Sequence, residues 1–337
     1  MRQFESARRL KFCERSVRVA VVGAGAIGGF IAGALARAGV DVAVVARGAH
    51  LEAIKRNGLR VRGELGDFTV DVPASSDLRE LGSFDFILVT LKAHQWDAVL
   101  PQFEPFLHTE ATIVPMQNGI PFWYFPDRSL HSVDPGGRLR HMFSDDRVLG
   151  AVVHASGNIP EPGVVAQMGG KLYPIGEIDG RCSDRVERFS ALLIAAGLEA
   201  PIEPAIRRAL WRKLLGNVSL NPVSALTRSS VAAMIDDPQT RALLRALMEE
   251  TIAVASAVGC DPQIDAEERI GFASRLGNVK TSMLQDLEAG RTLELDPIVG
   301  AVVELAREYG VAATHIETVY ALTNRLNAQS HASTSSA

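Results

Sequence analysis

The chain of 337 residues has few of the side chains that hold disulfides and metal ions. It contains only 3 Cys, namely Cys13, Cys182 and Cys260, and they form no CxxC pair. An odd number of distant cysteines predicts neither a disulfide framework nor a structural zinc site, and it favours a reducing cytoplasm. The 8 His form no HExxH motif and no pair four residues apart. We therefore expect no metal site.

The sequence also lacks a strong charge of one sign and any long apolar run. Lys and Arg number 35 against 39 Asp and Glu, for a net charge of -4. This balance argues against a nucleic-acid partner, since such proteins carry a basic stripe. No apolar run approaches the ~20 residues of a membrane span, so we expect no membrane partner. At ~150 residues per domain, the length predicts two domains.

Both ends of the chain are expected to lie outside the functional part. Residues 1–16 mix basic and acidic side chains and contain no apolar stretch, which indicates an N-terminal tail and not a secretory signal. The last residues, 328–337, read AQSHASTSSA. Small polar residues cannot bury enough surface to fold, so we predict a disordered tail there.

A glycine-rich turn near the start lies between a predicted strand and a predicted helix. The apolar run at 17–22 is followed by GAGAIG, a helical stretch and a second apolar run at 40–46; the turn comprises Gly23, Ala24, Gly25, Ala26, Ile27 and Gly28. Gly23 permits the tight turn, Gly25 lets the backbone approach a pyrophosphate, and Gly28 lets the helix pack close to the strand. The first helical N–H groups, with those of Ala26 and Ile27 among them, would face the phosphates. The unit predicts a dinucleotide site; the alternative is a glycine turn without a ligand.

The end of the second strand indicates which dinucleotide is bound. An NAD site usually carries an acidic residue there, which binds the ribose 2′-hydroxyl. In this sequence the strand ends in Arg47, with no carboxylate. A guanidinium can pair with a 2′-phosphate through two hydrogen bonds. We predict NADPH/NADP+ as the cofactor, with a solvated loop arginine as the alternative.

Two later apolar runs, at 84–90 and 111–116, are expected to join the same parallel sheet. Lys92 and Asn118 follow them at the carboxyl ends of the strands, where ligands bind in such sheets. Residues 120–148 then break the pattern with an aromatic run, FWYF. This loop could line or cover a pocket, or it could be a surface loop pinned by its own aromatic side chains.

The second half of the chain is dominated by helical patterns. The expected helices lie at 185–196, 203–218, 239–258 and 297–309, with a further one ending at 284–289. We expect a Rossmann domain with a mostly parallel, doubly wound sheet at 17–200 and an all-α domain at 201–327.

Polar residues in this half fall at helical spacing. Lys213, Asn217 and Asn221 follow one another at intervals of four residues, on one helix face. Buried lysine and asparagine are costly without partners, so the face is either a site or a solvent-facing stripe. Pro222 is expected to end or kink the helix just after this face. A further polar group, SMLQD at 282–286, is followed by the stretch ELD at 294–296.

Taken together, these motifs resemble the ketopantoate reductase (2-dehydropantoate 2-reductase) family. The resemblance rests on GAGAIG, LKA at 91–93, QNG at 117–119, WRK at 211–213 with the two asparagines, SMLQD and ELD, which together span nearly the whole chain.

The resemblance implies a Rossmann domain, a helical domain and an active site in the cleft between them. It implies that Lys213 is the catalytic lysine and that Glu294 is its acidic partner, which also contacts the substrate. The remaining implied site residues are Asn217 and Asn221 on the substrate side, Ser282 at the substrate carboxylate, Asn118 near both nicotinamide and substrate, and Lys92 as a cofactor-side or gating lysine. The aromatic loop and the N-terminal extension depart from short members of the family and leave the identity of the 2-oxo acid open.

The expected function is NADPH-dependent reduction of a 2-oxo acid to a 2-hydroxy acid. The first expectation is 2-dehydropantoate to (R)-pantoate, in pantothenate and coenzyme A biosynthesis. A protonated Lys213 would stabilise the developing oxyanion and donate the proton. The alternatives are the same chemistry on a bulkier 2-oxo acid and an NADP(H)-sensing protein without turnover. The apolar helical half could also support a homodimer.

Overall fold

Five short strands form a parallel sheet at the centre of the N-terminal half, in the order β5-β2-β1-β6-β7. The computed structural model describes residues 17–334, so the predicted tail at 1–16 lies outside the described residues. The strands are β1 (Arg18–Val22), β2 (Asp41–Val45), β5 (Ala74–Ser75), β6 (Phe86–Val89) and β7 (Thr112–Pro115). Their residues are mostly β-branched and buried on both faces, as parallel strands require. The four apolar runs predicted as strands are therefore confirmed.

Helix α1 (Ala26–Arg37) lies between this sheet and a second, four-stranded sheet with the order β4-β3-β10-β9. Gly29 and Gly33 of α1 face Val165 and Val61 so closely that a Cβ would overlap them. The second sheet consists of β3 (Leu59–Arg62), β4 (Phe68–Val70), β9 (His154–Glu161) and β10 (Val164–Leu172). The remaining elements of this half are α2 (Gly48–Asn57), α3 (Trp96–Val99), α4 (Arg138–Met142), α5 (Asp184–Ala195), the antiparallel pair β8 (Leu149–Ala151) and β11 (Ile175–Glu177), and 3-10 turns at Leu78–Leu81, Ala93–Gln95, Leu100–His108 and Asp145–Arg147.

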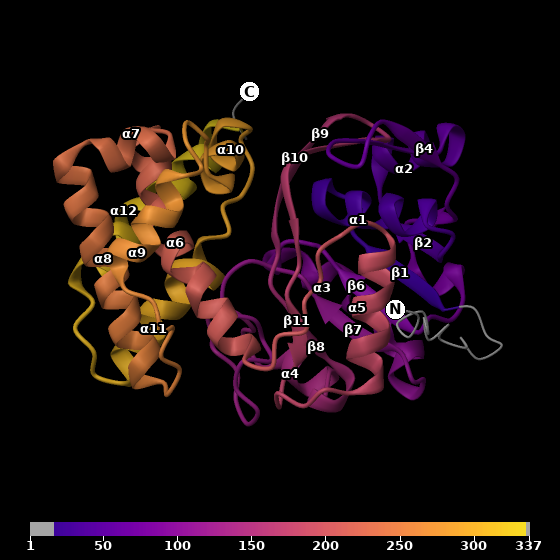
Figure 1. Ribbon diagram of the computed structural model, residues 1–337, viewed down its shortest axis with the longest axis horizontal. Helices are drawn as coiled ribbons and strands as arrows, with labels where there is room; N and C mark the ends of the chain where they lie inside the picture. Colours follow the sequence, from indigo (N-terminus) through magenta and orange to yellow (C-terminus); the bar gives the residue numbers. More distant parts are fainter. Residues whose placement is uncertain (1–16, 335–337) are drawn as a thin grey trace, which may run out of the picture.

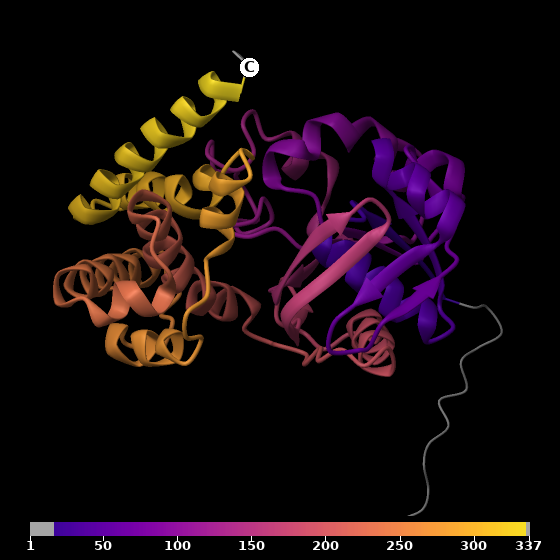
Figure 2. The same cartoon turned by 90° about the horizontal axis from the view of Figure 1, so that it is seen from above.

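The C-terminal half is helical and lies beside the α/β half in both views (Figures 1 and 2). Its central element is α6 (Ile206–Thr227), which packs against five other helices of this half. The other helices are α7 (Val231–Asp236), α8 (Pro238–Ala257), α9 (Ala266–Ser274), α10 (Ser282–Glu288), α11 (Ala301–Glu308), which continues from a π-helical turn at Asp296–Gly300, and α12 (Thr314–Thr334). The predicted fold class, a Rossmann domain followed by an all-α domain, is confirmed.

Two predictions of helix ends are wrong. Of the two outcomes expected at Pro222, an end or a kink, the end does not occur: α6 continues to Thr227, because its buried surface packs against neighbouring helices around Pro222 and outweighs the lost backbone bond. The chain is also helical beyond 328, since α12 continues to Thr334. A composition of small polar residues did not prevent the helix that starts at Thr314 from propagating, because each further residue adds one hydrogen bond.

The loop at 120–148 has two parts: its aromatic run is buried in the core, whereas later residues, among them Arg128 and Arg140, line a second cavity. Its residues Phe122, Trp123 and Tyr124 are buried, with Trp123 fully so. The indole Nε1 of Trp211, on α6, donates a hydrogen bond to the Tyr124 hydroxyl at 2.6 Å. These side chains belong to one apolar cluster that contains residues of both halves. The loop therefore joins the two halves through a shared core.

Candidate active site

The glycine-rich turn between β1 and α1 has the geometry that a pyrophosphate site requires. Gly23 has φ of 102°, a conformation open to glycine, and a Cβ on Gly28 would overlap the Gly23 carbonyl oxygen and Thr90 Oγ1. The Thr90 hydroxyl donates to the Gly23 carbonyl oxygen at 2.5 Å. Gly25 is the N-cap of α1, so the N–H groups of its first turn have no partners within the helix. The turn thus presents free N–H groups at the carboxyl end of β1.

Two side chains that the sequence did not single out hold this turn. Thr90 is one of them, and His50 of α2 is the other. The ring Nε2 of His50 lies 2.7 Å from the Ala24 carbonyl oxygen, and the Gly163 N–H donates to Nδ1 at 2.9 Å. This arrangement ties the turn to the second sheet.

Arg47 follows the end of β2 by two residues, and the N–H groups of the glycine turn at Gly23 and Ala24 bond to the last residue of that strand, Val45. The Arg47 side chain is exposed, and among residues 17–334 its guanidinium has no hydrogen bond or ion pair. A free cation at this strand end fits the 2′-phosphate of a dinucleotide. No acidic residue follows the strand there, so the position lacks the usual partner of a ribose 2′-hydroxyl.

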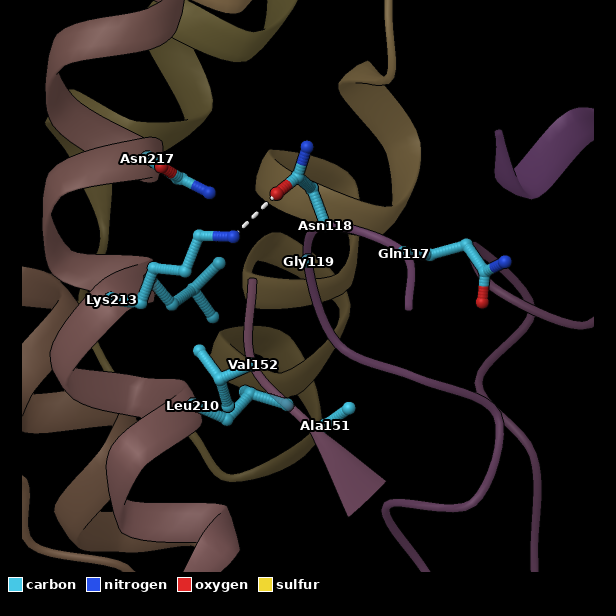
Figure 3. Close-up of a pocket in the computed structure, with 9 residues that line it drawn as sticks. Gln117, Asn118, Gly119, Ala151, Val152, Leu210, Lys213 and Asn217 are labelled. Carbon is cyan, nitrogen blue, oxygen red and sulfur yellow. Dashed lines mark hydrogen bonds between the residues drawn. The ribbon is translucent and has the colours of Figure 1, made fainter. Parts of the chain in front are cut away.

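Residues from the two halves meet at a chain of hydrogen bonds. The Lys213 ammonium, on α6, donates to Asn118 Oδ1 at 2.6 Å, and Asn118 Nδ2 donates to Glu294 Oε2 at 3.4 Å. Figure 3 shows Lys213 and Asn217 pointing from α6 toward the loop that carries Asn118. The pocket around them is lined by Gln117, Asn118, Gly119, Ala151, Val152, Leu210, Lys213, Leu214 and Asn217. The structure thus brings together residues that lie 95 and 176 positions apart in the chain.

Burial moves the pKa values of the two charged members toward each other. It lowers the pKa of Lys213 to about 8, against the opposing effect of the Glu294 carboxylate. Burial also raises the pKa of Glu294, while Lys92 and the Asn118 amide act to lower it. An ammonium with a pKa of about 8 can hold or release a proton near neutral pH.

The position of Asn118 depends on the residues that follow it. Gly119 has φ of 87°, and a Cβ there would overlap the Pro297 carbonyl oxygen and backbone. The Ile120 N–H donates to that carbonyl oxygen at 2.8 Å. The close approach of the two backbones holds the Asn118 amide beside Glu294, which precedes the π-helical turn by two residues.

Lys92 also links the two halves. Its ammonium forms an ion pair with Asp286 of α10 at 2.7 Å and donates to the Thr292 carbonyl oxygen at 3.2 Å. Gln117 Nε2 donates to the carbonyl oxygens of Val89 and Leu91, at 2.8 and 2.9 Å. Asp286 and Gln117 were therefore missed as positioning residues, although both lie inside motifs that the sequence presents.

The other predicted site residues differ in whether they line this pocket and in how exposed they are. Asn217 lines the same pocket as Lys213, one helical turn further along α6. Asn221 lies on the same face of α6 but is buried, with only 6% of its surface exposed. Ser282 is the first residue of α10 and is exposed; among residues 17–334 its hydroxyl has no hydrogen bond. Within the described part of the chain, no cluster of three or more potential metal ligands occurs and no helix is long and apolar enough to cross a membrane.

Comparison with known proteins identifies the family. Residues 19–180 match the family model "Ketopantoate reductase PanE/ApbA", and residues 205–327 match its C-terminal counterpart, "Ketopantoate reductase PanE/ApbA C terminal". The chain is 42% identical over 318 residues to a 2-dehydropantoate 2-reductase of Mesorhizobium japonicum, covering 92% of this chain and 98% of the relative.

Solved structures agree with this result. The 2-dehydropantoate 2-reductase of Geobacter metallireducens is 30% identical, with a TM-score of 0.82 and coverage of 92% of this chain and 99% of that one. A D-mandelate dehydrogenase, solved with NADH and anilino(oxo)acetate, is 19% identical and shares the fold, with a TM-score of 0.82 over 93% of this chain and 99% of that one. The resemblance drawn from the motifs is confirmed, and the chain belongs to the ketopantoate reductase family of oxidoreductases that act on CH–OH groups.

Proposed function

We propose that this protein reduces a 2-oxo acid to the corresponding 2-hydroxy acid with NADPH, and that 2-dehydropantoate is its substrate. The observation that carries the proposal is the chain of hydrogen bonds from Lys213 through Asn118 to Glu294. In it, Asn118 of the α/β half bridges two charged residues of the helical half. The name of the Mesorhizobium japonicum relative supports the choice of substrate.

Lys213 is proposed as the general acid. Its ammonium lines the pocket and donates one hydrogen bond, which leaves further N–H groups for a ketone oxygen. Negative charge grows on that oxygen as the ketone is reduced, and the ammonium both stabilises the charge and delivers the proton. Because the pKa of Lys213 lies at about 8, the proton is present at neutral pH and is released readily.

Glu294 and Asn118 are proposed to position that acid. The carboxylate opposes the effect of burial on the pKa of Lys213 and so keeps the lysine charged. The Asn118 amide accepts from the ammonium and donates to the carboxylate, which fixes the orientation of both. Asn217, Asn221 and Ser282 are proposed as uncharged donors to the substrate carboxylate and hydroxyl.

The residues around the glycine turn fit a nicotinamide dinucleotide phosphate. The turn and the first N–H groups of α1, at Ala26 and Ile27, would hold the pyrophosphate, and Arg47 the 2′-phosphate. Lys92 would face the cofactor side of the cleft. When bound, the cofactor supplies the hydride that reduces the ketone carbon. Localisation in the cytoplasm and assembly as a homodimer are further predictions.

Consumption of NADPH and NADH with a panel of 2-oxo acids tests the proposal. The panel contains 2-dehydropantoate, smaller 2-oxo acids and bulky aryl 2-oxo acids, and the chirality of each product is determined. We expect the highest kcat/KM for 2-dehydropantoate with NADPH, and (R)-pantoate as the product. Faster turnover of a bulky 2-oxo acid would identify that acid, and not 2-dehydropantoate, as the substrate. NADPH binding without turnover of any acid in the panel would identify a nucleotide-sensing protein.

A further inference from the structure

A further cationic side chain lies against the helix that carries Lys213. Arg269, on α9, packs over Gly216 of α6. A Cβ on Gly216 would overlap the guanidinium nitrogens and lie 2.8 Å from Arg269 Cζ, so the arginine can occupy this place only because the helix has a glycine there. Gly216 is three residues after Lys213, about 4.5 Å along the helix axis, and directly precedes Asn217. Arg269 therefore lies beside the segment of α6 that lines the pocket.

This guanidinium has no anionic partner in the described part of the chain. Among residues 17–334 it forms neither a hydrogen bond nor an ion pair, and burial alone lowers its pKa. The other cation near the site, Lys92, is paired with Asp286 at 2.7 Å. A largely buried cation without a partner is costly, and its place beside the pocket favours a bound anion as the missing partner.

A histidine in the α/β half lies within the influence of both Arg269 and Lys213. His154 is the first residue of β9, in the α/β half. Desolvation of the ring and then the charges of Lys213 and Arg269 lower its pKa to about 4, although part of the side chain remains exposed to solvent. The two cations therefore act on one space between β9, α6 and α9. At neutral pH His154 is uncharged and adds no further positive charge to this space.

We propose that Arg269 is a substrate-binding residue that holds the carboxylate adjacent to the ketone of the 2-oxo acid. The planar guanidinium can donate two parallel hydrogen bonds to one carboxylate. In a 2-oxo acid the carboxylate is bonded to the ketone carbon, so a ketone oxygen on Lys213 places it near the same segment of α6. Glu294 faces Lys213, and Asp286 pairs with both Lys92 and Arg291, so neither carboxylate neutralises Arg269, whereas the substrate carboxylate would.

The inference rests on the proposed function, and Arg269→Gln tests it with the full-length protein. We expect the KM for 2-dehydropantoate to rise by about 10- to 150-fold with little change in kcat, the loss expected when a charged hydrogen bond is removed. Arg269→Lys keeps the charge but loses the pair of parallel guanidinium donors, so its KM should lie between those of the wild type and Arg269→Gln. The matched control is Arg275→Gln at the end of the same helix, whose exposed guanidinium lies over the Phe272 ring and which should behave as wild type.

The primary amide of the same 2-oxo acid separates carboxylate recognition from general damage. The wild type should prefer the acid over the amide, and Arg269→Gln should lose that preference by the same factor while its affinity for NADPH is unchanged. An unchanged acid-to-amide ratio would overturn the inference. A rise in KM confined to 2-oxo acids with a second, distal carboxylate would also overturn the inference.

Oxamate binding, measured by calorimetry in the presence of NADP+, decides the inference without turnover. Oxamate carries the carboxylate and carbonyl of a 2-oxo acid. If the wild type reduces no 2-oxo acid, the proposed function fails, yet weaker oxamate binding by Arg269→Gln than by Arg275→Gln would still support the role of Arg269. Equal oxamate affinity in the two variants, or no binding by the wild type, would overturn it.

Discussion

The charge on Glu294 should set the pH at which the enzyme loses activity on the alkaline side. Lys213 acts as an acid, so the rate falls as the pH rises through its pKa of about 8. The Glu294 carboxylate raises that pKa, and its removal in Glu294→Gln should lower it. The alkaline limb of the profile of kcat against pH should therefore move to lower pH in the variant.

The structure gives the size of the shift. The bridging Asn118 amide lies 2.6 Å from Lys213 Nζ and 3.4 Å from Glu294 Oε2, so the two charged groups are at most roughly 8 Å apart. At an effective dielectric constant of ~20, charges at this separation interact by about 2 kcal/mol, which corresponds to roughly 1.5 pKa units. We expect a displacement of about 1 to 1.5 pH units.

Steady-state oxidation of NADPH at saturating 2-oxo acid, followed from pH 6 to about pH 10, measures the limb. Because Glu294 is also expected to contact the substrate, the position of the limb is the readout and not the absolute rate. Glu288→Gln is the matched control, since Glu288 is exposed on α10 and pairs with Lys280 at 2.8 Å. An alkaline limb that is identical in wild type and Glu294→Gln would refute the electrostatic coupling of the pair.

Three further changes test other parts of the account. Arg47→Ala should weaken NADPH binding by about 10- to 150-fold in a fluorescence titration and leave NADH binding unchanged; an equal loss for both would limit Arg47 to a role in the loop. Gly119→Ala should push the backbone away from Pro297 and displace Asn118, so that kcat falls while the Kd for NADPH is kept; normal kcat would contradict the role of this contact. Trp123→Ala should lower the free energy of unfolding in urea by about 3–5 kcal/mol, because the indole is fully buried, and an unchanged midpoint would place the loop outside the core.

Features that depend on local sequence could be predicted. The glycine turn and its flanking strands follow from residue types next to one another, because Gly23 needs a positive φ and Gly28 a close contact. The common face of Lys213 and Asn217 follows from helical spacing alone. That Glu294 lies near this face was expected only from the resemblance to the family, since the approach of distant segments depends on the tertiary fold.

Features that depend on packing could not be predicted. The pattern around Pro222 gives no sign that neighbouring helices support α6 on both sides of it. The aromatic loop resembles a surface loop until Trp123 is placed against α6. Arg269 lies in a helix with many charges, and nothing in its own segment shows that Gly216, 53 residues earlier, leaves room for it.

The most direct test of the central claim is the kcat of Lys213→Ala for reduction of 2-dehydropantoate, with the Kd for NADPH measured on the same preparation. Loss of the general acid should reduce kcat by at least ~10²-fold. NADPH should bind as in the wild type, because the glycine turn that would hold its phosphates lies in the other half of the molecule. A near-normal kcat in Lys213→Ala would contradict the account.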